Sequence, residues 1–269
     1  LVPVYYAQTA EFDVITATKL SKSYGTRAVL DNFTGTFPSG KVTSLIGPNG
    51  AGKSTLLMLL ARLLEPSSGE LTLNGTAVTG FKVDEYARQV ATLRQSPDLS
   101  LRLSVEELVG YGRFPHSRGR QTEDDRNAID RAISFLSLDD LRHKYINELS
   151  GGQRQMAFLA MTIAQDTPYL LLDEPLNNLD MHHGVHIMQA LRMLCDEMKK
   201  TVVLVIHDIN FAVNYSDNIV ALKAGQLHSS GAIDDVITES NLRDLYDLKF
   251  HILPRPNGLL CDYFTSGKQ

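Results

Sequence analysis

Hydrophobic positions along the chain follow two different spacings. Residues 169–172 and 202–206 are short apolar runs, residues 41–46 form a similar strand-like run that ends in Leu-Ile, and each leads through polar residues into a helix-prone segment. Runs of this kind that alternate with helices are typical of buried strands in a mostly parallel sheet. Residues 14–37 instead combine short β-prone runs with turn residues, which indicates an antiparallel layer before the main sheet. The pattern predicts an α/β fold.

Residues from about 97 to 167 have a different pattern. Hydrophobic residues recur there at helical spacing, at 105–109, 129–136 and 156–164, and strand signals are few. We therefore expect a helical subdomain inserted into the α/β core. Because there is no internal repeat, residues 14–269 are predicted to form a single domain. Residues 1–13 lack the regular pattern and are expected to be an expression remnant or a flexible arm.

The amino-acid composition bears on whether the protein binds nucleic acid or crosses a membrane. The net charge of −5 argues against nucleic acid, because proteins that bind it usually carry a basic surplus. Cys195 and Cys261 do not form a CxxC motif, and we expect them to be reduced thiols. No run approaches the ~18 apolar residues that a membrane-spanning helix needs. If the protein serves a membrane, a separate partner must cross it.

A glycine-rich motif of the form GxxxxGK[ST] lies between a predicted strand and a predicted helix. It consists of Gly47, Pro48, Asn49, Gly50, Ala51, Gly52, Lys53 and Ser54. Glycines let backbone N–H groups converge on a phosphate, and the helix N-terminus adds partial positive charge. In this context the motif predicts a P-loop, in which Lys53 reaches the β- and γ-phosphates of ATP and Ser54 binds Mg²⁺. Thr55, the next residue, is expected to contact a phosphate oxygen.

Polar residues follow three of the predicted strands. Asp173 and Glu174 end one strand, His207 ends the next, and Gln95 follows an earlier one. The carboxyl ends of parallel strands are where such folds bind ligands, although adjacent acids or a lone histidine are common in solvated loops. We expect Asp173 to hold Mg²⁺ and Glu174 to act as the general base toward water. His207 is expected to contact the γ-phosphate, and Gln95 to bind Mg²⁺ or the attacking water.

A second glycine-containing motif begins a predicted helix. It consists of Ser150, Gly151, Gly152 and Gln153. Ser150 and Gln153 have the spacing of a capping box, and an N-terminal cap alone would account for them. The start of a helix is also an anion-binding site. The chain would then have two phosphate-binding motifs, which one nucleotide uses only if they are brought together.

These motifs resemble those of ABC-transporter ATPases. GPNGAGKST, Gln95, LSGGQ, LLLDEP, residues 178–180 and His207 occur in the order and spacing of that family, over residues 14–263. The resemblance implies a P-loop NTPase core and a head-to-tail dimer. ATP bound by Lys53 of one subunit would be completed by Ser150 and Gly152 of the other. It also implies that Tyr24 stacks on adenine and that Asp180 lies at the dimer seam.

Four longer strings resemble the ATPases of ferric-siderophore, haem and vitamin B12 importers. They are residues 61–70, 105–120, 149–181 and 207–227, and residues 174–181 are most similar to the ferric-siderophore branch. The resemblance implies a transmembrane permease, an extracytoplasmic substrate-binding protein and a place on the cytoplasmic face of the membrane. Haem or vitamin B12 import remains an alternative. A non-transport ABC ATPase is a weaker one, because the chain lacks the tandem modules or long coiled coil of those proteins.

Two groups of basic or histidine residues could be either ordinary solvent-exposed surface or part of a functional site. His182, His183 and His186 are interpreted as a solvated helix face, because no carboxylate or cysteine was identified to complete a metal site. A basic cluster is formed by Arg113, His116, Arg118 and Arg120. It is either an exposed loop or part of a surface, within residues 95–120, that meets the permease.

Overall fold

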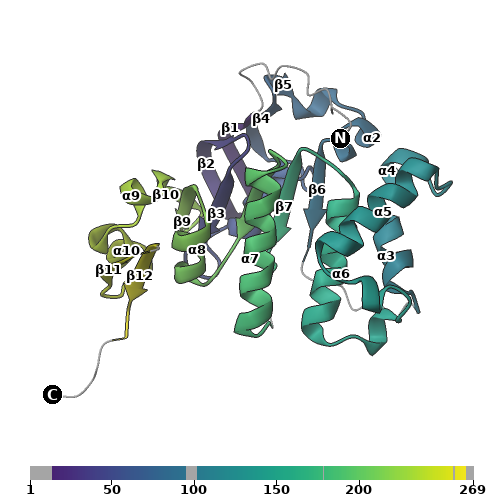
Figure 1. Cartoon of the computed structure of the whole chain (residues 1–269). Coiled ribbons are helices and arrows are strands. Elements are labelled where there is room, and N and C mark those ends of the chain that lie inside the picture. Colours follow the sequence, from purple (N-terminus) through teal and green to yellow (C-terminus); the bar gives the residue numbers. More distant parts are fainter. Residues whose placement is uncertain (1–13, 95–101, 178, 257, 265–269) are drawn as a thin grey trace.

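The computed structural model describes residues 14–94, 102–177, 179–256 and 258–264. Its central feature is a six-stranded sheet with the order β10–β9–β3–β8–β7–β6 (Figure 1). The strands are β3 (Val42–Ile46), β6 (Val90–Leu93), β7 (Tyr169–Asp173), β8 (Thr201–Val205), β9 (Asn218–Lys223) and β10 (Gln226–Ala232). All neighbours pair in parallel except β10, which is antiparallel to β9. Every residue of β3, β7 and β8 is buried, which confirms the parallel sheet predicted from the apolar runs.

A second, antiparallel sheet has the order β2–β1–β4–β5. It consists of β1 (Val14–Tyr24), β2 (Arg27–Pro38), β4 (Ser68–Leu73) and β5 (Thr76–Ala77). The buried apolar residues of β1 and β2 are separated by exposed or partly exposed ones, so one face of this layer packs inward and the other faces solvent. The inward face shares a hydrophobic core with α1 (Lys53–Leu60) and with the main sheet. The antiparallel layer predicted for residues 14–37 is therefore confirmed.

The expected helical subdomain packs beside the β6 edge of the sheet (Figure 1). It contains α3 (Val105–Tyr111), α4 (Phe114–Ser117), α5 (Glu123–Phe135) and α6 (Gly151–Ala164). Short 3-10 turns at Asp139–Leu141 and Ile146–Glu148 connect α5 to α6. Helix α6 contacts α3, α5 and β6, so it joins the subdomain to the sheet. The hydrophobic core of the subdomain is continuous with the core on one face of the main sheet.

The remaining elements complete the α/β core and the C-terminal region. Helices α7 (Met181–Asp196) and α8 (Ile209–Tyr215) cover the sheet face that this continuous core occupies. The 3-10 turn Val78–Gly80 and helix α2 (Val83–Ala87) precede β6. Helix α9 (Ile233–Val236) contacts β9 and β10, and helix α10 (Glu239–Tyr246) contacts β9. The hairpin β11 (His251–Arg255)–β12 (Gly258–Asp262) contacts α8 through β12 (Figure 1). Among the described residues, no helix combines the length and apolar character needed to cross a membrane.

Candidate functional site

The predicted P-loop connects β3 to α1, at the carboxyl end of a central strand. Gly47 has φ 137°, and a Cβ on it would lie 2.1 Å from the Leu222 carbonyl oxygen. Gly52 has φ 99°, and a Cβ there would lie 2.8 Å from the Val29 carbonyl oxygen. Side chains are thus excluded at both positions by backbone strain and by contact with neighbouring strands. The loop is held closely against the protein and ends where the N–H groups of the first turn of α1 begin.

Lys53 lies inside this loop. Its Nζ donates hydrogen bonds to the carbonyl oxygens of Gly47, at 2.7 Å, and of Pro48, at 3.0 Å. Burial lowers the pKa of Lys53, although the Glu174 and Asp173 carboxylates act in the opposite direction. A cation that is removed from water and held by neutral carbonyl groups is suited to bind an incoming anion, because phosphate oxygens offer it charge-assisted hydrogen bonds.

Asp173 is the last residue of β7 and faces the start of α1. Its Oδ1 accepts a hydrogen bond of 2.9 Å from Ser54 Oγ. Burial raises the pKa of Asp173, while the Ser54 hydrogen bond acts to lower it. A carboxylate and a hydroxyl side by side supply the hard oxygen ligands that Mg²⁺ prefers. The two residues predicted to hold Mg²⁺ therefore lie together and have suitable donor chemistry. Gln95, the third expected ligand, lies outside the described residues.

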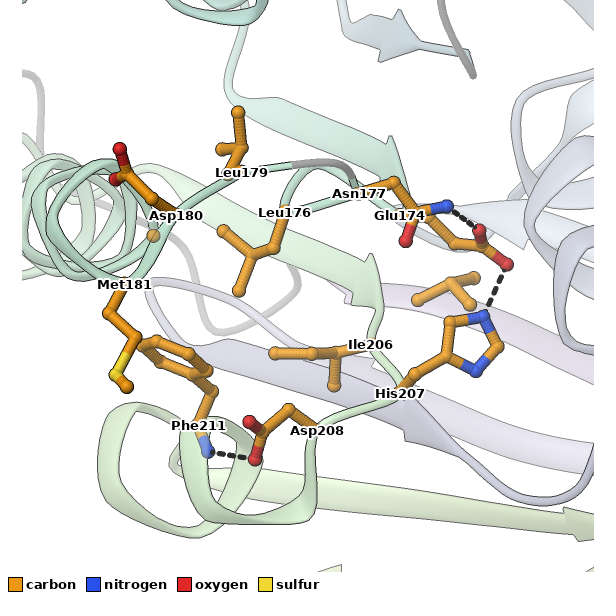
Figure 2. A pocket seen from close by; sticks show the side chains of 12 residues that line it. Glu174, Leu176, Asn177, Leu179, Asp180, Met181, Ile206, His207, Asp208 and Phe211 are labelled. Carbon is orange, nitrogen blue, oxygen red and sulfur yellow. Dashed lines mark hydrogen bonds and ion pairs between the residues drawn. The ribbon is translucent and has the colours of Figure 1, made fainter. Parts of the chain in front are cut away.

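Glu174 and His207 are in direct contact (Figure 2). His207 Nε2 lies 2.6 Å from Glu174 Oε1. Asn177 Nδ2 donates to the other carboxylate oxygen, Oε2. The backbone of Glu174 has φ 52°, an unusual value for a residue other than glycine. Both carboxylate oxygens are thus held by side chains from the ends of two neighbouring strands.

Asn177 is a site residue that was not identified from the sequence. It follows Glu174 by three residues, and Asn177 N donates to the Glu174 carbonyl oxygen at 3.2 Å, which closes a turn. The same turn brings its side chain back to the carboxylate. A cleft beside this turn is lined by apolar side chains that include Leu176, Ile206 and Phe211 (Figure 2). In the sequence, only the three-residue spacing between Glu174 and Asn177 could have indicated this contact. That spacing predicts a contact only when the turn conformation is known.

The second motif caps α6 as its spacing predicted. Ser150 Oγ accepts from the Gln153 N–H at 3.2 Å, and Gln153 Oε1 accepts from the Ser150 N–H at 3.1 Å. This confirms the capping box, with Gly151 and Gly152 in the first turn. Whether the same turn binds phosphate from a second subunit stays a prediction.

Tyr24 and Asp180 occupy positions that fit their predicted contacts. Tyr24 ends β1, is 52% exposed, and has Lys22 Nζ 5.3 Å from its ring centroid. Asp180 is the N-cap of α7, where its Oδ1 accepts from the His183 N–H at 2.9 Å. Hydrogen bonds from the His183 backbone and ring lower the pKa of Asp180. An exposed aromatic ring and an exposed carboxylate are available to a base and to a second subunit, respectively.

The basic cluster is not a single exposed surface. Arg113 is 7% exposed, and its Nε donates to Asp125 Oδ1 at 2.8 Å. Its Nη1 donates to the Ala164 carbonyl oxygen at 2.9 Å, so this arginine ties α5 to the end of α6. Arg118 pairs with Asp84, and His116 Nε2 lies 2.8 Å from the Gln165 carbonyl oxygen. The hypothesis that Arg113 belongs to an exposed basic surface was wrong, because a buried guanidinium requires partners inside the protein.

Comparison with known proteins identifies the family. Residues 30–177 match the sequence model of a protein family that is described as ABC transporter. The chain belongs to the ABC transporter family. The petrobactin import ATP-binding protein of Bacillus subtilis is 48% identical over 246 residues, which cover 91% of this chain and 98% of that protein. The iron(3+)-hydroxamate import ATP-binding protein of the same species is 38% identical over 90% of this chain and 92% of that protein.

Solved structures agree with this assignment. A dimeric bacterial ABC transporter cassette superposes with a TM-score of 0.73 at 30% identity, over 81% of this chain and 98% of that chain. An ABC transporter in an inward-facing conformation gives a TM-score of 0.81 at 23% identity, over 95% of this chain and 98% of that chain, and supports the fold alone. The ABC ATPase fold is therefore confirmed, and the chain is an ATP-hydrolysing cassette of this family.

Proposed function

We propose that the chain energises import of a ferric siderophore through a separate membrane permease. The observation that carries the proposal is 48% identity, over nearly the full length of both chains, with a petrobactin import ATP-binding protein. A ferric enterobactin transport ATP-binding protein of Escherichia coli is 36% identical over 88% of this chain. Because these relatives are named for chemically different iron chelates, they support the ligand class, and the higher identity favours a petrobactin-like cargo.

The site geometry supports a division of roles in ATP hydrolysis. Lys53 is placed to exchange its two carbonyl partners for phosphate oxygens, and Ser54 and Asp173 to hold Mg²⁺, which when bound would neutralise phosphate charge. Glu174 is placed to accept a proton from water. His207 and Asn177 fix the direction of its carboxylate. His207, which contacts Glu174 through Nε2, would also contact the γ-phosphate.

One face of the nucleotide would be bound by the P-loop, Gly47 to Ser54, together with Thr55 and Tyr24. Ser150 and its neighbours through Gln153 in a second copy would bind the other face. The dimeric cassette at 30% identity supports this head-to-tail pairing. Asp180, exposed before α7, would then lie at the dimer seam.

The helical subdomain offers a surface for the permease. Tyr111 and Phe114 are 57% and 59% exposed, and they line one groove together with Leu103 and Gly110. Large exposed apolar side chains around a groove are typical of protein interaction sites. We infer that this groove, rather than a basic cluster, docks the permease. The chain would then be peripheral to the cytoplasmic face of the membrane, and a substrate-binding protein would deliver the chelate on the other side.

Uptake of radiolabelled iron chelates tests the proposal. A strain that lacks this ATPase should lose uptake of ferric petrobactin or a related chelate. The wild-type gene should restore uptake, and Lys53→Ala should not. Restored uptake with Lys53→Ala would contradict the ATP-binding role. Intact iron uptake together with loss of haem or vitamin B12 uptake would overturn the cargo assignment alone.

A further inference from the structure

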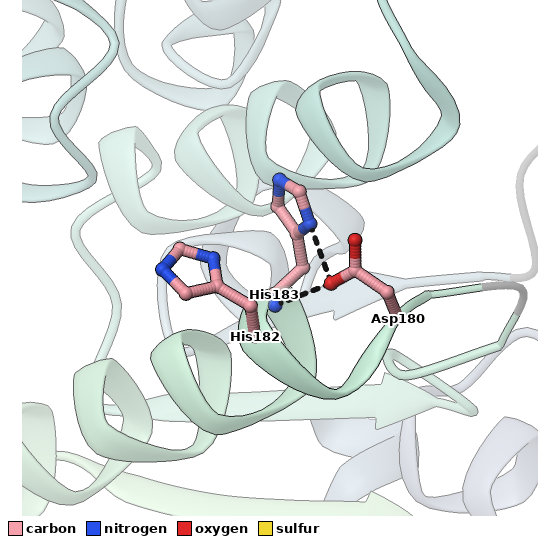
Figure 3. A group of neighbouring side chains, drawn as sticks. All are labelled: Asp180, His182 and His183. Carbon is pink, nitrogen blue, oxygen red and sulfur yellow. Dashed lines mark hydrogen bonds and ion pairs between the residues drawn. The ribbon is translucent and has the colours of Figure 1, made fainter.

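Two histidines and one carboxylate lie together at the start of α7 (Figure 3). One ligand atom from each of Asp180, His182 and His183 lies within 4.8 Å of the other two. His183 Nδ1 is 2.8 Å from Asp180 Oδ1. The sequence interpretation of these histidines as a solvated helix face assumed that no carboxylate was nearby. That assumption was wrong, because the N-cap position folds Asp180 back over the first turn.

The position of His183 is fixed by the second motif as well as by Asp180. A Cβ on Gly152 would lie 2.8 Å from two ring carbons of His183 and 3.0 Å from its Nδ1. The imidazole therefore lies directly on the first turn of α6, and only glycine at residue 152 leaves room for it. Its side chain is 30% exposed, whereas His182 is fully on the exposed side of α7. One ligand is thus preorganised, and the other is exposed, with its ring against those of His183 and His186.

We propose that Asp180, His182 and His183 form a binding site for a divalent first-row transition-metal ion. Two imidazoles and one carboxylate are the donor set typical of Fe²⁺ sites with open positions, and they also suit Zn²⁺ and Co²⁺. Imidazole ligands disfavour Mg²⁺, which prefers oxygen. The metal replaces the proton between His183 Nδ1 and Asp180 Oδ1, whose spacing already suits two ligands on one ion.

Only a small movement completes the site. Two ligand atoms on one ion with bonds of ~2.1 Å stand at most ~4.2 Å apart. The widest separation in the cluster is no more than 4.8 Å, so a rotation of the exposed His182 side chain closes the difference. Asp180 Oδ1 also caps α7, and the second carboxylate oxygen would take over that role when Oδ1 binds the ion.

The site gives a route to feedback by the imported metal, and this step rests on the proposed function. Asp180 is expected to reach a second subunit, and Gly152 belongs to the motif expected to bind the second subunit's ATP. A metal held by Asp180 and His183 keeps the Asp180 carboxylate from contacting the second subunit. It also links that carboxylate to α6, because the His183 ring lies on the first turn of this helix. Iron that a cytoplasmic one-electron reductant releases from the ferric chelate as Fe²⁺ would thereby lower ATP turnover by the importer that brought it in.

Metal binding is tested on the purified chain without nucleotide. Co²⁺ serves as the coloured probe, titrated in excess Mg²⁺, and Fe²⁺ competes with it under anaerobic conditions. We expect saturable binding of one ion, and His182→Ala should weaken it about tenfold or more. The matched control is His228→Ala, on the exposed face of β10 and outside the cluster, which should bind Co²⁺ like the wild type. Equal Co²⁺ binding by wild type and His182→Ala overturns the proposal.

His186 lies one turn further along α7 and could form a simpler metal site with His182 alone. Variants of His186 distinguish the two sites. The rings of His182 and His186 are 6.4 Å apart, and residues four apart on a helix can chelate a metal as a pair. His186→Ala should retain Co²⁺ binding, and Asp180→Asn should lose it. The reverse result assigns the ion to the pair and overturns the three-residue site.

ATP turnover at a fixed free Fe²⁺ or Co²⁺ concentration tests the feedback. The metal should slow the wild type and leave His182→Ala at the rate it has with Mg²⁺ alone, since His182 is not among the residues assigned to nucleotide binding. Equal slowing of both proteins overturns the feedback. Absence of turnover by the wild type with Mg²⁺ alone would contradict the proposed function instead, while the Co²⁺ titration would still decide whether the site exists.

Discussion

At the residue scale, the site is built from side chains that hold one another in place. Lys53 is held by two loop carbonyls, Ser54 by Asp173, and Glu174 by His207 and Asn177. Preorganisation of this kind lowers the cost of ordering the groups when they act. Most of these residues were named from the sequence, but the contact of Asn177 with Glu174 came from the conformation of one turn.

We expect Asn177→Ala to lower kcat for ATP hydrolysis by about tenfold while KM changes little. Removing one hydrogen bond to a charged group costs roughly 1.5 kcal/mol, and here it loosens the general base without touching the phosphate-binding groups. Steady-state ATPase kinetics measure the effect. Asn210→Ala, which removes an amide that caps the C-terminal hairpin, is the control and should leave kcat nearly unchanged. A rise in KM with unchanged kcat would contradict the positioning role of Asn177.

At the element scale, the helices of the helical subdomain are joined to one another by a buried ion pair as well as by apolar packing. Arg113 follows α3, Asp125 lies in the first turn of α5, and Ala164 ends α6, so the pair connects three helices. Although burial raises the pKa of Asp125, hydrogen bonds from Thr122 and Arg113 outweigh it and lower the pKa to about 2. The arginine therefore has a structural role that its sequence neighbours do not reveal.

We expect Asp125→Asn to reduce the free energy of unfolding at pH 7 by about 3 kcal/mol, because it leaves Arg113 buried without its carboxylate. The depressed pKa of Asp125 also predicts a pH dependence. Its contribution is complete above the unfolded-state pKa of about 4 and is lost as the pH falls toward 2. Urea unfolding at pH 7 and at low pH measures both effects. Arg118→Ala, which breaks the exposed pair with Asp84, should cost no more than about 1 kcal/mol. A similar loss for both variants would contradict the structural role.

At the scale of the whole molecule, the C-terminal region supports the nucleotide loop. Tyr246, at the end of α10, accepts a hydrogen bond from the Gly47 N–H at 3.1 Å. Its ring packs near Phe250, which packs near Tyr263 of the C-terminal segment. Burial raises the pKa of Tyr246 to about 12, so the hydroxyl stays neutral at physiological pH. The first glycine of the P-loop is thus held by a residue at the far end of the chain.

We expect Tyr246→Phe to leave the Gly47 N–H without this partner and to destabilise the protein by about 1 kcal/mol. Because the loop start is loosened, KM for ATP should rise more than kcat falls. Thermal unfolding and ATPase kinetics measure the two effects. Tyr263→Phe, which keeps its place in the aromatic cluster, serves as the control. Unchanged KM in Tyr246→Phe would show that the loop does not depend on the C-terminal region.

A second prediction at this scale concerns the ATP-dependent dimer. Glu174→Gln should bind ATP but barely hydrolyse it, because the general base is lost while the phosphate-binding groups remain. The protein should then accumulate as an ATP-bound dimer on size-exclusion chromatography. Combining this change with Lys53→Ala should return it to a monomer. A monomer with normal turnover for Glu174→Gln alone would contradict the role of Glu174.

The sequence by itself determined the features that depend on neighbouring residues. Buried strands showed as apolar runs, the P-loop as glycines between a strand and a helix, and the capping box as Ser150 and Gln153 three residues apart. These are set by backbone hydrogen bonding and local sterics, which act within a few residues. The shared edge of the parallel strands then brought Asp173, Glu174 and His207 into one site.

Only the tertiary structure decided the contacts between distant segments. Arg113 became a buried ion-pair residue because three helices close around it, and His183 met Gly152 because α7 packs beside the start of α6. Gly47 and Tyr246 are 199 residues apart in the chain. Such contacts depend on how whole elements pack, and the same local pattern is compatible with an exposed or a buried side chain until that packing is known.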